Sequence, residues 1–262
     1  MAAPHYPITA VAPTVAAVLG LRAPREAEAP PLPRVGADLA GVSAVAVLAA
    51  DAVGLTVWQR WQEEMPFLTA LHARRHLVLH AVAPPITPVN FASLVTGASL
   101  DGHGVRERTM RLRADSLFDI VAEAGAATAG VGQLNYTGGE FLACHSSLNG
   151  RTAVAGDDAV AEMVLRLARD YRPRFLIAQL GEPDTMFHKV GLSSPEVAPV
   201  LRETDARLRR MTEELAAQGF GVILLADHGQ HEVPAEDEPG RFRGQHDGSV
   251  RDDFLIPCTW VA

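Results

Sequence analysis

The sequence predicts an α/β protein with a mostly parallel central sheet and helices on both faces. Short apolar runs alternate with longer amphipathic segments along most of the chain, a pattern typical of strands joined by crossover helices. Several of the runs are apolar throughout, as expected for strands covered on both faces. With 262 residues, 48% of them hydrophobic, the chain is long enough for a large core, and residues 1–262 are predicted to form one domain.

Five apolar runs are the predicted strands of this sheet, and they occupy residues 42–50, 76–82, 127–132, 174–180 and 221–226. The amphipathic segments between them predict helices at 55–74, 88–96, 114–124, 157–170 and 196–218. A last strand is expected at 253–260. The proline-rich stretch 22–36 is expected to be a surface connector, within a connecting region at 25–41, because what precedes it is too short to fold alone.

The composition argues against several classes of partner. The formal net charge is −8, so no basic surface is expected for a nucleic-acid polymer. The first 21 residues are apolar but carry three prolines and no basic leader, so neither a signal peptide nor a membrane span is expected. Two cysteines, Cys144 and Cys258, are too few for a disulfide framework. A cytoplasmic location is the resulting expectation, and the oligomeric state is left open.

Three of the predicted strands lead to an aspartate. Asp51 follows the run at 42–50, Asp184 follows 174–180 after a short loop, and Asp227 follows "VILLA" directly. Ligands of such sheets bind beyond the carboxyl ends of the strands, so these three carboxylates are expected to converge on one rim. Any one of them alone could be an ordinary helix cap. The argument therefore depends on the whole set.

Histidines accompany these aspartates at informative spacings. His228 follows Asp227 directly, His188 lies four residues after Asp184, and His246 stands in "GQHDG". A separation of four residues places two side chains on the same face of a helical turn, within reach of one ion. Three carboxylates and three imidazoles suit two divalent cations with positions open for substrate.

Thr87 is the candidate nucleophile. It precedes Pro88, a residue type favoured at the first helical position, so Thr87 is expected at the N-cap of the following helix. The helix dipole and the free amides there favour negative charge, which suits an alkoxide and a phosphate oxygen. An ordinary capping threonine is the alternative interpretation.

The order of these motifs resembles that of a known family. The pattern T-x-x-N-x-x-S-L-V-T-G begins at Thr87, and H-G-V follows at 103–105, E-P-D-x-x-x-H at 182–188 and D-H-G at 227–229. Together with the upstream Asp51 and the late histidine, it is similar to the alkaline phosphatase superfamily, and within it to the type I phosphodiesterases of the nucleotide pyrophosphatase branch. The resemblance implies an alkaline phosphatase-like sandwich fold.

The resemblance also implies roles for individual residues. One divalent ion, expected to be zinc with manganese or iron as alternatives, would be held by Asp184, His188 and His246. A second would be held by Asp51, Asp227 and His228, with the oxygen of Thr87. Asn90 matches an asparagine whose amide would bind a phosphate oxygen. The implied reaction is hydrolysis of a small phosphate ester or nucleotide through a phosphothreonine on Thr87.

Two departures from the family pattern are visible. "DAVG" stands at Asp51 where relatives commonly have Asp-Gly, so the local turn is expected to differ. The second concerns a segment that usually follows the last histidine in relatives. The stretch "AVAPTVAAVLGLRAP" at 10–24 is similar to it, so a circular permutation is inferred, with 1–24 as the permuted segment. An unrelated N-terminal helix is the alternative.

Several alternatives stay open at this point. A phosphomonoesterase or a phosphonoacetate hydrolase could use the same site, and a non-catalytic metal- or phosphate-binding protein is the alternative of another class. Monoesters would call for extra cations, for which Lys189, Arg241 and Arg243 are candidates, with solvated surface charges as the alternative. Phe91 and Tyr136 could stack on a base or belong to core or loop packing. His231, next to the D-H-G motif, could lie at the metal rim or serve a loop. His103 matches a family position near the site, where a structural role in its turn or behind the ligands is expected.

Overall fold

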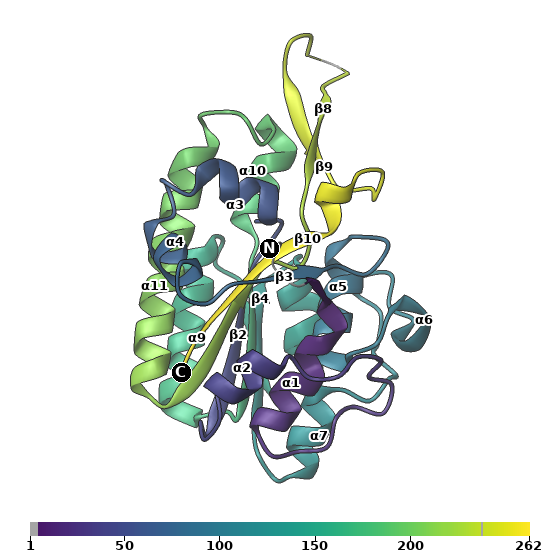
Figure 1. Cartoon of the computed structure of the whole chain (residues 1–262), viewed down its shortest axis with the longest axis vertical. Helices are drawn as coiled ribbons and strands as arrows, with labels where there is room; N and C mark the ends of the chain where they lie inside the picture. Colours follow the sequence, from purple (N-terminus) through teal and green to yellow (C-terminus); the bar gives the residue numbers. More distant parts are fainter. Residues whose placement is uncertain (1–4, 237) are drawn as a thin grey trace.

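An eight-stranded sheet, in the order β1-β3-β10-β7-β2-β6-β4-β5, runs through the computed structural model, which describes residues 5–236 and 238–262 (Figure 1). Its strands are β1 (His5–Pro7), β2 (Ala44–Ala50), β3 (Leu77–His80), β4 (Thr128–Gln133), β5 (Leu148–Thr152), β6 (Phe175–Leu180), β7 (Phe220–Leu225) and β10 (Leu255–Val261). Every neighbouring pair is parallel except the two that involve β10, which is antiparallel to β3 and β7. The predicted, mostly parallel α/β fold is confirmed.

Helices cover both faces of the sheet because its central strands are apolar throughout. In β2, Val45, Val47 and Ala49 join one hydrophobic cluster, whereas the alternate residues, such as Ala46 and Leu48, join the other. The first cluster is covered by α1 (Val11–Val18), α2 (Pro33–Asp38), α5 (Thr87–Thr96) and α7 (Leu117–Glu123). The second is covered by α3 (Leu55–Trp61), α4 (Pro66–His72), α9 (Asp157–Tyr171), α10 (Glu182–Val190) and α11 (Val197–Ala217). Figure 1 shows α9 and α11 opposite α1, α5 and α7.

The helix predicted at 55–74 is wrong as a single element. It forms two helices, α3 and α4, separated at residues 62–65. The residue before a proline is disfavoured in the helical region, and Met65, which precedes Pro66, has φ −125° and ψ 61°. Pro66 then begins α4, where a missing amide hydrogen costs nothing.

Two long segments between the predicted elements contain regular structure of their own. Within 132–156 lie the π-helical turn η2 (Gly138–Leu142), the short helix α8 (Ala143–His145) and the edge strand β5. Within 231–244 lies most of an antiparallel hairpin of β8 (His231–Pro234) and β9 (Phe242–Gln245), which extends away from the rest of the molecule (Figure 1). Smaller elements are η1 (Ile8–Ala10), α6 (Leu100–His103) and η3 (Arg251–Phe254).

The N-terminal segment lies close to the C-terminal strand. β1 pairs with β3, which in turn pairs with β10, and Val11 and Val15 of α1 belong to the same hydrophobic cluster as Trp260. Helix α1 packs against η1, α2, α5 and α7. None of the helices formed by the described residues is long and apolar enough to cross a lipid bilayer.

Candidate metal centre

Three adjacent strands bring the predicted aspartates to one rim of the sheet. The neighbours β7, β2 and β6 are parallel, so their carboxyl ends lie on the same side. Asp51 follows β2, Asp227 follows β7, and Asp184 lies in the first turn of α10, just beyond β6. The backbone amide of Asp51 donates to the carbonyl of Leu180 at the end of β6, which joins two of these strand ends directly.

The first group, called the closed cluster, consists of Asp51, Asp227 and His228. Their exposed fractions are 2%, 0% and 0%. His228 Nε2 lies 3.5 Å from Asp51 Oδ1 and 3.4 Å from Asp227 Oδ2. Among the described residues these two carboxylate oxygens are buried without a hydrogen-bond partner. Buried carboxylate oxygens without a partner are costly unless a cation compensates them, so the closed cluster fits a cation.

The second group, called the open cluster, consists of Asp184, His188 and His246. Asp184 Oδ1 lies 3.3 Å from His188 Nε2 and 3.8 Å from His246 Nε2. The two Nε2 atoms are 3.2 Å apart. The side chain of His188 is 45% exposed, so this cluster is accessible from solvent.

The backbone fixes the tautomer of all three imidazoles. His188 donates from Nδ1 to the Gly244 carbonyl, His246 to the Pro85 carbonyl and His228 to the Gly229 carbonyl, at 2.8, 2.9 and 3.0 Å. A carbonyl only accepts hydrogen bonds, so each Nδ1 carries the proton and each neutral ring keeps a lone pair on Nε2. Such hydrogen bonds from the distal nitrogen are typical of metal-binding histidines.

In each cluster, the distances between the ligand atoms suit coordination of one ion better than direct hydrogen bonds. Ligand atoms about 2.0–2.1 Å from a tetrahedral ion stand roughly 3.3 Å apart, close to the distances in both clusters. A third group of potential ligands, His231, Asp247 and Asp253, differs because His231 Nδ1 and Asp253 Oδ1 are 2.7 Å apart. That distance is a short hydrogen bond, and Asp253 Oδ2 also accepts from the Gly248 amide at 2.9 Å. The third group therefore satisfies itself without an ion.

The two clusters adjoin each other and the candidate nucleophile. The rings of His228 and His246, one from each cluster, are stacked with centroids 4.1 Å apart. Thr87 Oγ1 lies 3.2 Å from His228 Nε2. Phosphorus held between the clusters would therefore stand within reach of a hydroxyl already beside one of them.

Electrostatics at the clusters reflect burial and crowded carboxylates. Burial raises the pKa of Asp51 well above its ordinary value, and the charges of Asp227 and Asp184 raise it further. Burial also opposes ionisation of Asp184, yet its contact with His188 and the nearby His228 bring its pKa below the usual range. The same contact with Asp184 raises the pKa of His188. Bound cations would relieve the repulsion among the three carboxylates.

Thr87 is the first residue of α5, and the N-cap is Ile86, so the predicted N-cap position is wrong by one residue. Asn90 is fully buried, and its amide nitrogen donates to the carbonyls of Val82 and Ile86, both at 3.3 Å. Its Oδ1 accepts from the Val82 amide at 2.7 Å. These contacts brace the turn that carries Thr87. The phosphate-binding role of Asn90 stays a prediction.

The turn after Asp51 has a glycine-like conformation without a glycine. Ala52 has φ 59°, in the left-handed region that residues with a Cβ rarely adopt. Its amide donates to Asp227 Oδ1 at 3.2 Å, so this backbone conformation helps to hold a carboxylate of the closed cluster. The expectation that "DAVG" would change the turn stays a prediction.

The remaining candidate side chains have structural partners. Phe91 is fully buried in the core, which leaves no face for stacking on a substrate. Tyr136 packs over Gly181 and its hydroxyl contacts Thr185 Oγ1 at 2.8 Å. His103 is buried, with Nε2 3.2 Å from Ser93 Oγ. Lys189 is exposed, and Arg241 pairs with Glu238 at 3.0 Å.

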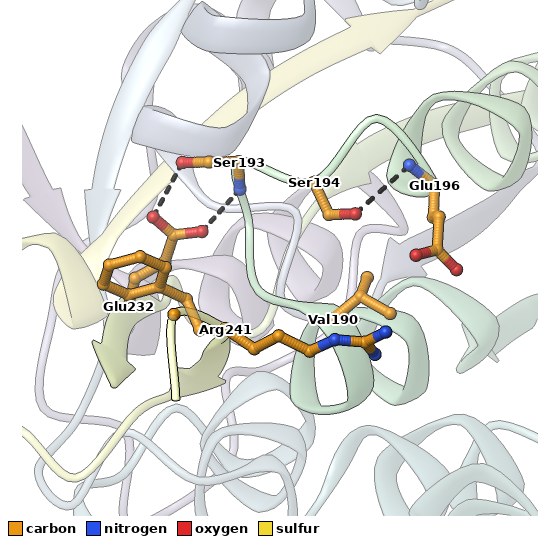
Figure 2. Close-up of a pocket in the computed structure, with 8 residues that line it drawn as sticks. Val190, Ser193, Ser194, Glu196, Glu232 and Arg241 are labelled. Atoms are coloured by element: carbon orange, nitrogen blue, oxygen red, sulfur yellow. Dashed lines mark hydrogen bonds between the residues drawn. The ribbon is translucent and has the colours of Figure 1, made fainter. Parts of the chain in front are cut away.

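A cavity of about 290 Å³ lies beside the hairpin, between β8, the start of β9 and the segment after α10. Figure 2 shows Glu232 of β8 reaching across to Ser193, whose backbone amide and hydroxyl donate to its two carboxylate oxygens at 2.5 and 2.7 Å. No residue of the two clusters lines this cavity. The contact fastens the hairpin, which leads to His246, to the segment that follows His188.

Two buried glutamines contact the clusters, although the sequence patterns do not predict a role for them. The side-chain amide of Gln179 donates to Asp51 Oδ2, and that of Gln230 donates to Asp184 Oδ1. Gln179 is 2% exposed and Gln230 is 1% exposed. A polar residue inside the apolar run "FLIAQL" is the signal that marks Gln179, because buried polar groups need partners.

Sequence and structure comparisons identify relatives of this chain. The chain is 25% identical to venom phosphodiesterase 2 of Crotalus adamanteus over 217 residues, which cover 68% of this chain and 26% of the relative. It thus spans about a quarter of the length of that relative. The structure of phosphonoacetate hydrolase from Sinorhizobium meliloti 1021 in complex with phosphonoformate is similar, with TM-score 0.58 and 20% identity, covering 76% of this chain and 59% of that one.

Murine ectonucleotide pyrophosphatase / phosphodiesterase 5, as an inactive threonine-to-alanine variant in complex with AMP, has TM-score 0.57 and 17% identity, covering 74% of this chain and 59% of that one. At such identities these two structures show a common fold. The sequence model of the family described as type I phosphodiesterase / nucleotide pyrophosphatase matches residues 45–129 and 131–246, more than half of the chain. The chain therefore belongs to the type I phosphodiesterase / nucleotide pyrophosphatase family.

Proposed function

We propose that this chain hydrolyses phosphate esters, preferentially diesters or nucleotide pyrophosphate bonds, with two divalent cations and a phosphothreonine on Thr87. The observation that carries the proposal is the pairing of two adjacent clusters of carboxylate oxygens and Nε2 lone pairs, with the Thr87 hydroxyl beside one of them. In the closed cluster, two of these oxygens are buried without a hydrogen-bond partner among the described residues. Membership of the family supports the reaction class.

Asp51, Asp227 and His228 would hold one ion and Asp184, His188 and His246 the other. Carboxylate and imidazole ligands in sets of three suit zinc with an open position. Manganese and iron are the alternatives. The ions would supply positive charge that favours an ionised Thr87 and stabilises a departing oxygen.

Thr87 Oγ1 would lose its proton and bond to phosphorus while the ester bond to the leaving oxygen breaks. The open cluster, where His188 is 45% exposed, marks the side from which the ester enters and the leaving group departs. Water from that side would then break the bond between phosphorus and Thr87 Oγ1, releasing the product and restoring the hydroxyl. Two displacements at phosphorus predict net retention of configuration. The inactive threonine variant reported for the murine relative supports a threonine nucleophile.

Charge favours a singly charged diester over a doubly charged monoester. Two divalent cations and three aspartates leave the site near +1. Lys189 is exposed, and Arg241 is engaged by Glu238, so these two side chains offer little additional charge to a monoester. A nucleotide is the favoured substrate class because the murine relative holds AMP. Phosphonoacetate is the second candidate, since a structural neighbour from Sinorhizobium meliloti acts on it.

One zinc-analysed preparation should be assayed with bis-p-nitrophenyl phosphate, p-nitrophenyl phosphate, nitrophenyl thymidine monophosphate and phosphonoacetate. We expect the two diesters to be turned over most efficiently. Thr87→Ala should lose activity by at least about 10³-fold and keep its zinc, whereas Thr96→Ala, in the same helix but bonded to the Ala92 carbonyl, should keep both. Preference for p-nitrophenyl phosphate would overturn the diesterase assignment. Bound zinc with no turnover of any ester would favour the non-catalytic alternative.

We also propose that residues 5–24 occupy the place of a permuted C-terminal segment; residues 1–4 of the predicted segment 1–24 lie outside the described residues. The family match begins at residue 45, and α1 shares its hydrophobic cluster with Trp260 of β10, which supports the proposal. One sheet takes strands from both ends of the described chain, which supports one catalytic domain. A cytoplasmic location stays a prediction.

A further inference from the structure

The open cluster depends on the placement of a single helical turn. Asp184 and His188 both belong to α10 and are separated by four residues, so any tilt of its first turn displaces both side chains together. His246 comes from a different segment and is fixed independently through the Pro85 carbonyl. Whatever holds the start of α10 therefore decides whether the three groups can meet around one ion.

A buried carboxylate from another helix holds that turn. Asp157, the first residue of α9, is 1% exposed, and its two oxygens accept hydrogen bonds from the backbone amides of Gly181 and Glu182 at 2.9 and 3.0 Å. These amides begin α10, where amides have no partner within the helix. Burial raises the pKa of Asp157 to about 6, although the two amides favour its ionised form.

A second contact keeps the same turn against its neighbours. Arg207 of α11 donates to Glu182 Oε2 at 2.7 Å and to Asp158 Oδ1 at 2.6 Å. Tyr136 packs on the far side, where a Cβ on Gly181 would come within 2.5 Å of its ring. The turn is thus held by α9, by α11 and by the segment before η2. Of these three contacts among the described residues, the one from Asp157 binds the backbone amides of the turn.

From this arrangement we propose that Asp157 is a positioning residue for the open cluster: by binding the backbone of the first turn of α10, it presents Asp184 and His188 to one ion. It contacts neither the ion nor the substrate. The inference rests on the proposed function, because it requires that the open cluster binds a divalent cation. It assigns Asp157 to the open cluster alone, since α10 carries no residue of the closed one.

The chain contains a matched control for this role. Asp205 of α11 is 4% exposed, and its two oxygens accept from the backbone amides of Phe67 and Leu68, both at 2.9 Å, in the first turn of α4. Burial raises its pKa as well. Asp205 therefore performs the same capping task on a helix that carries no cluster residue. Removing either carboxylate should lower the stability of the fold by a similar amount, but only the removal of the Asp157 carboxylate should weaken metal binding.

The experiment compares full-length Asp157→Asn and Asp205→Asn with the wild type, all loaded with zinc. Competition with a chromogenic chelator gives a dissociation constant for each ion, and thermal unfolding gives Tm. We expect Asp157→Asn to weaken the ion of the open cluster, identified as the one that His188→Ala fails to bind, about 10- to 100-fold, the range typical of groups that orient ligands, and to leave the other within about 3-fold. Asp205→Asn should lower Tm comparably and change neither constant by more than about 3-fold.

Asp157→Ser, which keeps a small acceptor, is the second variant if Asp157→Asn does not fold. An intermediate loss of affinity for the same ion supports the inference. Unchanged constants in the folded Asp157 variants overturn it and leave the proposed function intact. Equal weakening by the Asp157 and Asp205 variants also overturns it, because general destabilisation then explains the effect. If the wild type binds no zinc, both proposals fail.

Discussion

The imidazoles of His188 and His246 face each other through Nε2 atoms 3.2 Å apart, while each donates its Nδ1 proton to a backbone carbonyl. Two neutral rings in this pose direct two lone pairs at one point. They repel unless a proton or a metal ion stands between them. Asp184 Oδ1, 3.3 Å from His188 Nε2, adds negative charge at the same point. The geometry of the open cluster is therefore that of a cation site.

Chelation should remove two ions in two phases. His188 is 45% exposed in the open cluster, whereas every residue of the closed cluster is at most 2% exposed, so a chelator should reach the first ion sooner. Zinc release to a chromogenic chelator measures both phases, and His188→Ala should abolish the fast one. His231→Ala should still bind two ions, since its group satisfies itself by hydrogen bonding. A third ion, or release of both together, would contradict this.

Gln179→Met should weaken the ion of the closed cluster. Its amide donates to Asp51 Oδ2 and its carbonyl accepts from the Gly138 amide at 2.5 Å, so the side chain holds the carboxylate with Oδ1 toward His228. Loss of such a group typically costs about 10- to 100-fold in metal affinity. Zinc affinity of the slowly released ion is the measurement.

Gln133→Met is the control for that substitution. Gln133 also lies in the sheet and accepts from the Gly156 amide at 2.8 Å, but it contacts no cluster residue. It should leave the affinity of the slowly released ion unchanged. Equal affinities in Gln179→Met and the wild type would show that Asp51 is oriented without its amide partner.

Sequence patterns predict the core of this fold better than its edges. The apolar runs at 42–50, 174–180 and 221–226 correspond to β2, β6 and β7, because burial on both faces favours apolar residues at nearly every position. Strand β5 has only two buried residues in "LNGRT", so its pattern does not differ from that of a loop. The break between α3 and α4 is caused by Pro66. The sequence-based prediction follows the amphipathic periodicity of 55–74 and gives this proline too little weight.

The same limit applies to the site. Motif spacing suggests which groups gather, because strand ends of a parallel sheet share one rim. It does not reveal Asp157 or Gln179, whose partners lie 24 and 128 residues away in the chain. Such contacts depend on how α9 and β6 pack against their neighbours. A lone buried aspartate or glutamine carries no periodic signal, so only the three-dimensional arrangement identifies its partner.

Acid should destabilise the protein through His72. This side chain lies against Trp58, with ring centroids 4.5 Å apart, and its Nδ1 is 2.9 Å from His76 Nδ1, a contact that requires one ring to donate and the other to accept. Burial lowers the pKa of His72 to about 3. Between that value and about 6.5 the unfolded chain binds a proton that the folded chain does not, so stability falls as the pH falls.

His72→Phe should reduce this pH dependence, because phenylalanine can pack on Trp58 and does not titrate. Urea unfolding of the zinc-free protein at pH 7 and pH 5 gives the difference in unfolding free energy. For each unit by which the pH falls, the unfolding free energy of the wild type should decrease by up to about 1.4 kcal/mol more than that of the variant. His80→Phe, at an exposed ring, should behave like the wild type. A variant as sensitive to acid as the wild type would assign the effect to other histidines.

Gly229→Ala should disrupt the closed cluster without touching any ligand. A Cβ at Gly229 would lie 2.0 Å from the Asp252 carbonyl oxygen, and Gly54 is also close, since a Cβ on it would meet Gly229 Cα at 2.4 Å. These neighbours are backbone atoms, so they cannot yield as a flexible side chain would. His228 precedes this residue and donates to its carbonyl, so a displaced Gly229 also moves Nε2.

We expect Gly229→Ala to lower the unfolding free energy of the zinc-free protein by about 1–3 kcal/mol, the usual cost of overpacking. Zinc binding at the closed cluster should weaken in addition. Gly36→Ala is the control: it lies in α2 with no atom within 4 Å of the added Cβ, and alanine is the better helix former by up to about 1 kcal/mol. If Gly229→Ala had the same urea stability and the same zinc affinity as the wild type, the backbone around His228 would be more flexible than these contacts imply. The closed cluster would then owe its geometry to the ion instead of to the fold.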